Sequence, residues 1–252
     1  MYSIDDYERP SVAADSIVFG IDITAPESRK SLKQRKLMVL LIKRGEEPFL
    51  GHFSMPGGFL RKGESIEQAA VRELNEEAGV NEPKIIGLGV YSKAGRDPRG
   101  WIISCAFIAL TKTVELKTAV GSDAAEARWF EFEYEDRGSE EVITLTGGDD
   151  RIEISYSEGQ AHENALAFDH GQMLYDAFKK LRDEVVHHDL IFDLMPQLFA
   201  ISDLQQPYEA IVGTKLTPQG FRKKMMSKLT ETEFYDEAAA HRTSKLYSRK
   251  TN

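Results

Sequence analysis

The chain has 252 residues, of which 41% are hydrophobic and 29% charged, a composition typical of a globular protein with one or two domains. Its longest apolar run, residues 37–42, is far too short to cross a bilayer, and the opening sequence MYSIDDYERP has no signal-peptide pattern. The single cysteine, Cys105, excludes an internal disulfide bond and fits a reducing compartment. We therefore expect a cytoplasmic protein that has no membrane partner.

The net charge of −9 is unevenly distributed along the chain. Residues 201–252 carry nine basic and six acidic side chains, which gives +3 for this segment and −12 for residues 1–200. Such an asymmetry favours a separate C-terminal module with an anionic partner.

The N-terminal part of the chain predicts two strands followed by a turn. Residues 12–23 alternate apolar β-formers, and residues 37–44 form the apolar run expected of a buried central strand. The segment 48–59 ends in a Pro-Gly-Gly turn, which lets the backbone approach a ligand closely. Gly57 and Gly58 are therefore candidate substrate-binding positions.

A helix is predicted directly after this turn. Ser65 followed by Gln68 fits a capping box, and Gly79 is a typical C-terminal stop. Its apolar face is formed by Ile66, Ala69, Ala70 and Leu74.

Three glutamates gather on the polar face of this helix. Glu73, Glu76 and Glu77 are spaced i, i+3 and i+4, so their side chains project from one side. Like charges this close repel each other, and such a cluster is usually held together by a bound cation. An all-oxygen ligand set suits Mg²⁺ or Mn²⁺. A plain acidic surface helix is the alternative, but it leaves the flanking glycines and Arg72 unexplained.

Residues 58–80, GFLRKGESIEQAAVRELNEEAGV, resemble the Nudix box, whose pattern is G-x5-E-x7-R-E-U-x-E-E-x-G-U with U an aliphatic residue. The resemblance covers about residues 12–185 and implies a Nudix α/β/α sandwich with a mixed sheet. It also implies a Mg²⁺-dependent hydrolase that cleaves the pyrophosphate of a nucleoside diphosphate linked to another moiety. Every fixed position of the pattern is filled, by Gly58, Glu64, Arg72, Glu73, Leu74, Glu76, Glu77, Gly79 and Val80.

The box residues have distinct expected roles. Glu73, Glu76 and Glu77 would hold the cation, and Glu64 would add a ligand or a water-mediated contact. Arg72 lies among these acidic side chains, so we expect it to orient them through bidentate hydrogen bonds rather than to touch the substrate. Some family members use a general base outside the box, and the candidates that the sequence leaves open here are Asp123, Glu126, Glu158 and Glu163.

A hairpin is predicted after the box, with strands at 83–93 and 101–111. Its tip carries Arg96 and Arg99, which are candidates to grip a phosphate or a terminal ribose. Trp101 is a candidate to stack on a base. The alternative is a solvated tip with Trp101 in the core.

A second hairpin, residues 141–157, is predicted to turn at Gly147-Gly148. A helix of at least four turns follows, with its start near Phe168. We interpret Asp169 as a residue of the helix start, and a pocket-lining role for Asp169 and His170 is the alternative.

The C-terminal segment predicts a winged helix-turn-helix. Ser202 is a candidate cap for a helix that ends at Gly213, and Thr217-Pro218 opens a second, basic helix that continues to about residue 231. A basic strand or ribbon closes the chain, which is the order of elements expected of this DNA-binding module. The alternative is a solvated basic face on a dimerisation or docking domain. The candidate contacts to the phosphate backbone of DNA are Arg222, Lys223, Lys224, Arg242 and Lys245.

The whole chain is similar to the Nudix-related transcriptional regulators of NAD metabolism, which join a Nudix domain to a C-terminal winged helix. We accordingly divide it into a Nudix domain, residues 1–185, and a winged-helix domain, residues 186–252. The wing departs from the family, because residues 241–244 are His-Arg-Thr-Ser where a Gly-Arg-Pro turn is usual. The shared strings are PFLG (48–51), PGGF (56–59), RDPRGW (96–101), AFDH (167–170) and FRKK (221–224).

Two functions are compatible with these features. The first is a Mg²⁺-dependent pyrophosphohydrolase with an ADP-ribose-like substrate. The alternative is an effector-sensing, DNA-binding transcriptional regulator whose Nudix domain binds ADP-ribose or a sugar-derived ligand. The two are not exclusive, because a sensor can hydrolyse its effector slowly. Both modules are commonly dimeric in the family, so we expect a homodimer.

Overall fold

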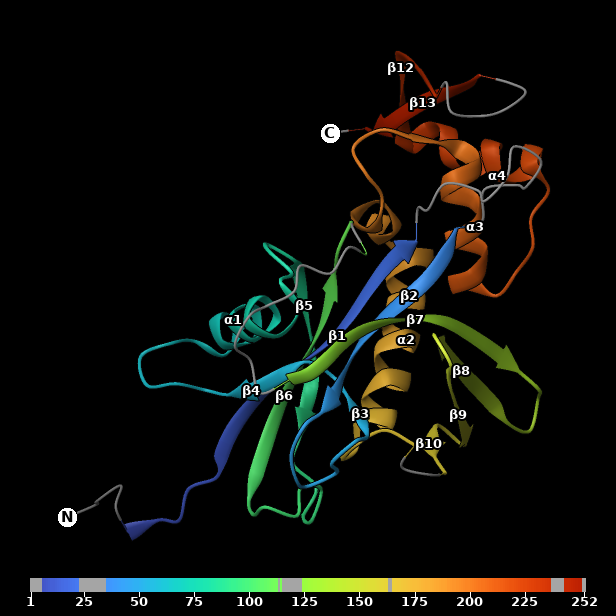
Figure 1. The fold of residues 1–252 in the computed structure, drawn as a ribbon. Helices are drawn as coiled ribbons and strands as arrows, with labels where there is room; N and C mark the ends of the chain where they lie inside the picture. Colours follow the sequence, from blue (N-terminus) through green and yellow to red (C-terminus); the bar gives the residue numbers. More distant parts are fainter. Residues whose placement is uncertain are drawn as a thin grey trace.

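The computed structural model describes residues 6–22, 35–112, 114, 124–162, 165–236 and 243–250 (Figure 1). A mixed sheet occupies the centre, and a smaller helical and stranded unit lies at one end, beside the C-terminus. No helix among the described residues is long and apolar enough to cross a membrane.

The central sheet has the strand order β10-β9-β8-β7-β2-β1-β6-β5, with β3 paired to β2 and β4 paired to β1. Strands β1 and β6 are parallel, and the other described pairs of this sheet are antiparallel. The predicted mixed sheet is therefore confirmed. Its strands are β1 (Ser11–Asp22), β2 (Lys36–Arg44), β3 (Phe53–Ser54), β4 (Gly57–Phe59), β5 (Lys84–Tyr91), β6 (Ile102–Leu110), β7 (Ala124–Asp136), β8 (Glu141–Gly147), β9 (Asp150–Ser157) and β10 (Gln160–Ala161).

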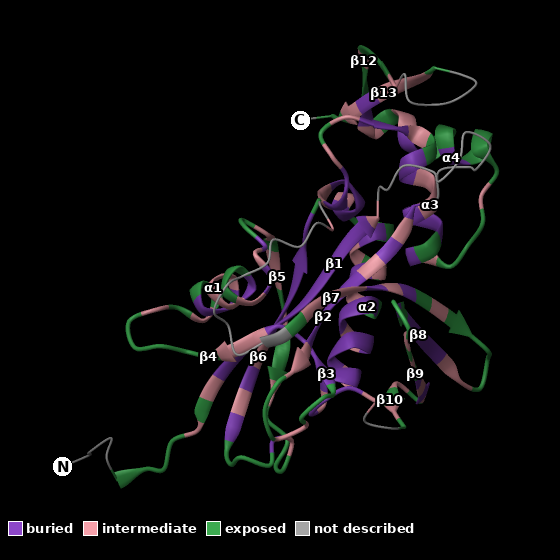
Figure 2. Cartoon of the chain, in the orientation of Figure 1, coloured by how far each residue is buried: buried purple, intermediate pink, exposed green. Residues whose placement is uncertain are grey.

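Helices α1 (Ile66–Ala78) and α2 (His170–His187) cover opposite faces of the sheet. Successive side chains of a strand point to opposite faces, and β1 follows this rule. Ile17 and Phe19 pack in the cluster that contains α2, whereas Val18 packs in the cluster that contains Leu74 of α1. Both faces of β1 are therefore buried, as Figure 2 shows.

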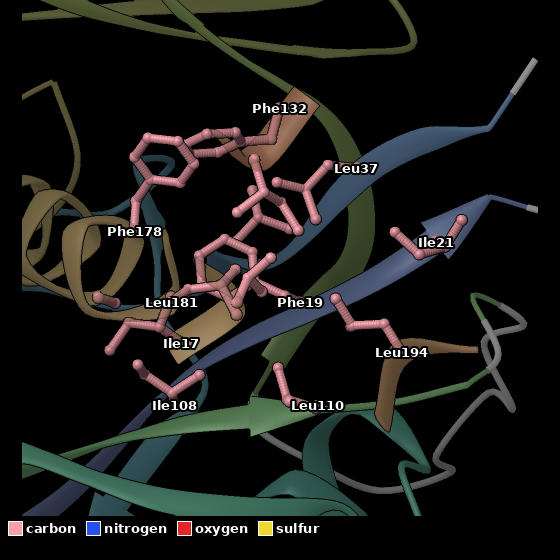
Figure 3. Close-up of a cluster of buried hydrophobic side chains, with 14 of the residues drawn as sticks. Ile17, Phe19, Ile21, Leu37, Ile108, Leu110, Phe132, Phe178, Leu181 and Leu194 are labelled. Atoms are coloured by element: carbon pink, nitrogen blue, oxygen red, sulfur yellow. The ribbon is translucent and has the colours of Figure 1, made fainter. Parts of the chain in front are cut away.

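The main core lies between the sheet and α2 (Figure 3). Phe132 and Phe178 pack with tilted rings at 4.8 Å between centroids, and Leu181 of the same cluster is fully buried. The same cluster continues without interruption into the C-terminal unit, where it includes Tyr208 and Phe221. The two parts of the chain thus share one hydrophobic core.

The C-terminal unit is a helix-turn-helix followed by a strand hairpin, as predicted for a winged helix. Thr217 caps its second helix by accepting a hydrogen bond from the Gly220 N–H, and Pro218 is the first helical residue. The elements are a 3₁₀ segment (Asp189–Leu194), β11 (Phe199–Ala200), α3 (Ile201–Val212), α4 (Pro218–Met225), a 3₁₀ turn (Met226–Lys228), β12 (Leu229–Asp236) and β13 (Ser244–Arg249).

Two predicted boundaries in this unit are wrong. α3 begins at Ile201 and not at a Ser202 cap, and its N-cap Ala200 makes no side-chain capping bond. α4 ends at Met225, a 3₁₀ turn follows, and residues from Leu229 onward form β12 because they pair with the basic strand β13. The predicted domain boundary at 185–186 lies in the last turn of α2 and stays a prediction.

Because the core is shared, truncating a buried side chain of α2 is expected to destabilise both parts of the chain together. Leu181→Ala should lower the free energy of unfolding by about 2–5 kcal/mol. Chemical denaturation followed by fluorescence and circular dichroism measures this loss. Val186→Ala, on the same helix at a position that is 38% exposed, is the matched control and should cost less than about 1 kcal/mol. Two separate transitions, with the loss in only one of them, would contradict the shared core.

Candidate functional site

A cleft of about 730 Å³ opens where β1, β2, β4, α1, the β5–β6 loop and the start of α2 meet. One group of lining residues is acidic and another is basic, with two aromatic rings beside the basic group. The acidic residues are Asp15, Glu46, Glu73, Glu76, Glu77 and Asp97, the basic ones Lys43, Arg44, Arg61, Arg96 and Arg99, and the rings Phe59 and Phe168. A cleft with both signs of charge suits an anionic ligand that carries a cation.

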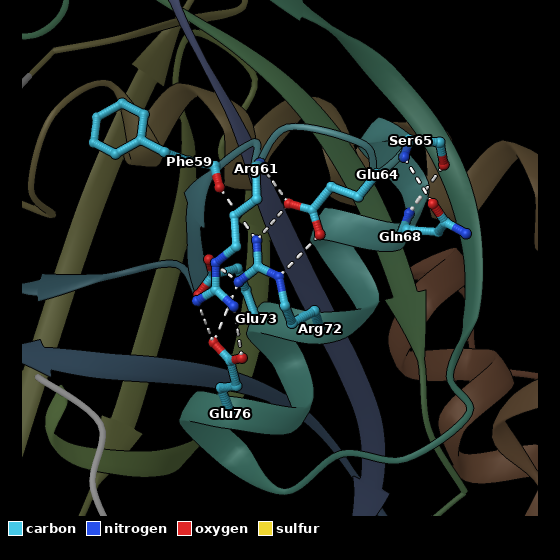
Figure 4. Close-up of polar contacts among 8 residues, drawn as sticks. All are labelled: Phe59, Arg61, Glu64, Ser65, Gln68, Arg72, Glu73 and Glu76. Carbon is cyan, nitrogen blue, oxygen red and sulfur yellow. Dashed lines mark hydrogen bonds and ion pairs between the residues drawn. The ribbon is translucent and has the colours of Figure 1, made fainter.

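Arg72 organises the acidic group (Figure 4). Its guanidinium donates to both carboxylate oxygens of Glu64, over 3.0 Å from Nε and 2.7 Å from Nη2. Nη1 donates to Glu73 over 2.5 Å and to Glu76 over 3.2 Å. The hydrogen bond from Arg72, followed by the one from the Arg61 N–H, holds the pKa of Glu64 at about 2. Arg72 therefore makes the bidentate contact that we predicted for it.

Glu77 is the most perturbed carboxyl group of the cleft. Its Oε2 accepts a 2.9 Å hydrogen bond from the Gly57 N–H. Burial raises the pKa of Glu77 to about 8, the Gly57 N–H opposes that shift, and the anions Glu73 and Asp15 add to it. A crowded, partly buried set of anions of this kind is stabilised by a cation, which would lower the pKa of Glu77 again.

The chemistry of these donors fits a hard divalent cation, because all of them are carboxylate oxygens. In this structure they face Arg72, Arg61 and the Gly57 N–H, and no three His, Cys, Asp or Glu side chains among the described residues converge on one point. The donor set for a cation is thus present, while its convergence depends on rotation of these side chains away from Arg72.

The two predicted glycines lie where a side chain does not fit. A Cβ atom at Gly57 would overlap Asp15 Oδ1 and the carbonyl oxygen of Ala14, and one at Gly58 would overlap the Glu73 carboxylate. Both glycines belong to β4, which pairs with β1. The absence of a Cβ therefore lets the turn pack directly against the acidic group.

The predicted arginines both line the cleft, but each already has a carboxylate partner. Arg96 is buried and makes a bidentate ion pair with Asp169, over 2.9 and 2.6 Å. Arg99 binds Asp97 over 2.7 Å and stacks its guanidinium over Phe168 at 5.1 Å and over Phe59 at 5.2 Å. Arg96 is therefore fixed in place, whereas Arg99 lies on an aromatic surface of the cleft.

Arg44 was not identified from the sequence and is a further basic group of the cleft. Its guanidinium lies 4.9 Å from the centre of the Phe168 ring, which Arg99 also contacts. Burial and the neighbouring Arg99 lower the pKa of Arg44. Two guanidinium groups against one ring repel each other, and an anionic ligand between them relieves that repulsion.

Asp15 and His170 are two further cleft residues, one missed by sequence reasoning and the other ranked second. Asp169 is at the N-cap position of α2 as predicted, but it makes no capping bond and instead binds Arg96. His170, which we placed only in the alternative, lines the cleft and is buried. Asp15 lies on β1 among apolar residues, and the only signal for it was a charge inside a buried strand.

Trp101 and the two described general-base candidates, Glu126 and Glu158, do not line this cleft. Trp101 is 56% exposed and is not part of the cleft wall, so its alternative placement in the core is wrong, whereas its stacking on a base stays a prediction. Glu126 pairs with Arg128, and neither it nor Glu158 lines the cleft. Asp123 and Glu163 lie outside the described residues.

The described candidates for DNA binding are Arg222, Lys223 and Lys224 on α4 and Lys245 on β13. Lys223 and Lys224 are exposed on α4 and form no ion pair within the described part of the chain, and Lys224 lies 5.5 Å from the Tyr208 ring centre. Arg222 donates to the Tyr247 hydroxyl over 3.0 Å, and Lys245 pairs with Glu231 over 2.6 Å. Arg242 lies outside the described residues.

The fold and the cleft define a two-part protein, an α/β sandwich with a charged cleft joined to a winged helix of the DNA-binding type. Residues 27–141 match the model of the NUDIX domain, and residues 191–248 match that of the NrtR DNA-binding winged helix domain. The chain therefore contains a NUDIX domain followed by an NrtR-type winged helix domain. The NUDIX family includes hydrolases, which in general use divalent metal ions.

Three similar proteins cover the chain to different extents. The ADPR responsive transcriptional repressor NtrR of Acinetobacter baylyi is 28% identical over 98% of this chain and 84% of its own length. The ADP-ribose pyrophosphatase of Methanocaldococcus jannaschii is 43% identical over 50% of this chain and 64% of its own length. The crystal structure of a MutT/nudix family protein from Enterococcus faecalis has a TM-score of 0.77 at 28% identity, covering 99% of this chain and 90% of the other.

The packing of the turn predicts a large cost for a side chain at Gly57. Gly57→Ala should lower the free energy of unfolding by at least about 2 kcal/mol, because the methyl group would overlap β1 backbone atoms that cannot move freely. Chemical denaturation measures the change. Gly87→Ala is the matched control, since a Cβ atom at that strand position has no neighbour within 4 Å, and it should change stability by less than about 0.5 kcal/mol. Equal effects of the two substitutions would be inconsistent with this packing.

Proposed function

We propose that the chain is a DNA-binding transcriptional regulator whose NUDIX domain binds ADP-ribose or a closely related nucleoside diphosphate. The observation that carries the proposal is the pair Arg44 and Arg99 on one aromatic ring, in the cleft that the glutamates of the box also line. A diphosphate fits between the two groups, with its charge neutralised by the arginines on one side and by a cation held by the glutamates on the other. The repressor of A. baylyi, which is responsive to ADPR and matches over 98% of this chain, supports this choice of ligand.

Two elements connect the cleft to the winged helix in this proposal. α2 begins at the cleft with His170 and packs in the shared core against α3. β2 carries Arg44 at its cleft end, and Arg35, just before its other end, binds Asp203 of α3 over 3.1 Å. A ligand that moves the cleft end of either element would bias the position of α3, which is the physical requirement for coupling between the two sites.

On the DNA side, the basic face of α4 would meet the phosphate backbone. Lys223 and Lys224 project from its exposed side and have no carboxylate partner within the described residues, so both are free to neutralise phosphates. Arg222 and Lys245 would first have to leave Tyr247 and Glu231. We therefore assign the larger share of the backbone contacts to the two lysines.

Hydrolysis of the ligand is the second candidate function, and the complete glutamate set favours it. Glu73, Glu76 and Glu77, with Glu64 as a further ligand, would hold Mg²⁺, which supplies charge neutralisation and an acidified water. Arg72 would keep Glu64 in place while Glu73 and Glu76 turn from it to the cation, and the Gly57 N–H would orient Glu77. The ADP-ribose pyrophosphatase of M. jannaschii, at 43% identity, supports an activity of this type.

Removal of the two lysines should weaken DNA binding in a salt-dependent way. For Lys223→Ala/Lys224→Ala we expect the slope of log affinity against log salt to fall by about 2, one unit for each lost phosphate contact. Fluorescence anisotropy with a labelled duplex measures the slope. Lys62→Ala/Lys93→Ala, which removes the same charge from the NUDIX part, should leave it unchanged. If Lys223→Ala/Lys224→Ala does not change the slope, α4 does not bind the phosphate backbone as proposed.

Loss of one box carboxylate should abolish turnover. Glu77→Gln should lower kcat for ADP-ribose at least about 100-fold with Mg²⁺, since the neutral amide is a poor ligand for a hard cation. Release of AMP measures the rate. Glu67→Gln, on the exposed side of the same helix, should retain full activity. If the wild-type protein binds ADP-ribose but does not hydrolyse it, the result contradicts the hydrolase function and is consistent with the sensor function.

A further inference from the structure

Asp15 and His170 form a buried polar pair in the cleft that neither the box nor the DNA-binding surface explains. The side chain of His170 is 4% exposed and that of Asp15 is 11% exposed, and both residues line the cleft. They come from β1 and the first residue of α2, which lie 155 positions apart in the sequence. Polar groups this deeply buried are normally satisfied by hydrogen bonds, so their partners identify what the pair does.

The tautomer of His170 is fixed by the backbone. The Met55 N–H lies 2.8 Å from His170 Nδ1, and because a backbone N–H only donates, Nδ1 must be the unprotonated nitrogen. Burial lowers the pKa of His170, which keeps the ring neutral. The proton of the neutral ring therefore sits on Nε2, and among the described residues this N–H has no hydrogen-bond acceptor.

Asp15 supplies the opposite kind of group. Its Oδ2 accepts a hydrogen bond from the Ser104 hydroxyl, and its Oδ1 lies 3.9 Å from His170 Nε2. That separation is too long for a direct hydrogen bond. It is short enough for one oxygen atom at about 2.8 Å from both to accept from Nε2–H and donate to Oδ1.

We propose that Asp15 and His170 form a subsite for one ribose hydroxyl of the nucleotide ligand, an inference that rests on the proposed function. A hydroxyl group is both a donor and an acceptor, which is what the pair requires. A phosphate oxygen only accepts and would be repelled by the carboxylate, whereas an amino group only donates and would leave Nε2–H without an acceptor. The cleft thereby distinguishes a nucleotide by a sugar hydroxyl and not by its charge alone.

Conservative variants remove the ligand-binding group of His170 or Asp15 and keep the hydrogen bond that each side chain makes within the protein. His170→Asn replaces Nδ1 by an amide oxygen that still accepts from the Met55 N–H, but it lacks the Nε2–H donor. Asp15→Asn still accepts from Ser104 while its amide nitrogen no longer accepts from a ligand. Asp176→Asn, which alters a side chain bonded to Tyr91 on the same helix but outside the cleft wall, is the matched control.

The test compares ADP-ribose with its analogues that lack a single hydroxyl on either ribose. Binding is measured by calorimetry with Ca²⁺ in place of Mg²⁺, so that the carboxylates keep a hard cation while turnover of the ligand is suppressed. We expect both variants, but not Asp176→Asn, to bind ADP-ribose about tenfold more weakly than the wild type. For one deoxy analogue the wild type should show the same loss and the variants no further loss, and the position of the missing hydroxyl identifies which ribose occupies the subsite.

Each other result overturns the inference. If the variants lose affinity equally for ADP-ribose and for every deoxy analogue, the pair serves the fold or the diphosphate and reads no hydroxyl. If neither variant changes affinity, the pair does not touch the ligand. Should the variants fail to fold, the analogue series on the wild type decides alone, because every analogue binding as tightly as ADP-ribose rules the subsite out. A wild-type protein that binds none of these ligands refutes the proposed function instead.

Discussion

The mutual repulsion of the box carboxylates is the constraint on which the cleft depends. Arg72 counters it by binding Glu64, Glu73 and Glu76 with one guanidinium group. The same side chain donates to the carbonyl oxygen of Phe59 at the end of β4. A single cation thus joins the turn that precedes the helix to the helix itself, and this explains why a planar, five-donor group occupies the position rather than a lysine.

The Pro-Gly-Gly turn before the helix sets the position of the acidic group relative to the sheet. Gly57 and Gly58 let β4 pair with β1 at Asp15 and Ala14, while the Gly57 N–H holds Glu77. Because β1 is buried on both faces, this arrangement connects the acidic group to the core that also contains α2 and the winged helix. The cleft and the DNA-binding unit therefore rest on the same packed scaffold.

Features of the box helix that depend on neighbouring residues were predicted correctly from the sequence. Contacts between distant elements were not. The capping bonds of Ser65 and Gln68 and the left-handed Gly79 depend on neighbouring residues, so spacing alone identified them. The cleft residue Arg44 and the pair of Asp15 with His170 depend on contacts between strands and helices far apart in the chain, for which a single sequence carries no pattern.

The C-terminal errors have the same origin. β12 (Leu229–Asp236) is mostly polar and exposed, so its sequence does not separate it from the preceding helix. It is a strand because β13 pairs with it. α3 starts one residue before the predicted cap because β11 leads directly into it. In both cases tertiary pairing decided what local preference left open.

The two proposed activities lie on different sides of one sheet. The groups that would act on a pyrophosphate belong to α1, which packs on the face formed by Val18 and Leu40. The groups that would connect the ligand to DNA belong to α2 and to the strand end at Arg35, on the opposite face or at its edge. Sensing requires tight binding of the ground state, whereas hydrolysis requires preferential binding of the transition state. Because the connection from the cleft to the winged helix runs through α2 and β2 and not through α1, changes in α1 can reduce turnover while that connection stays intact.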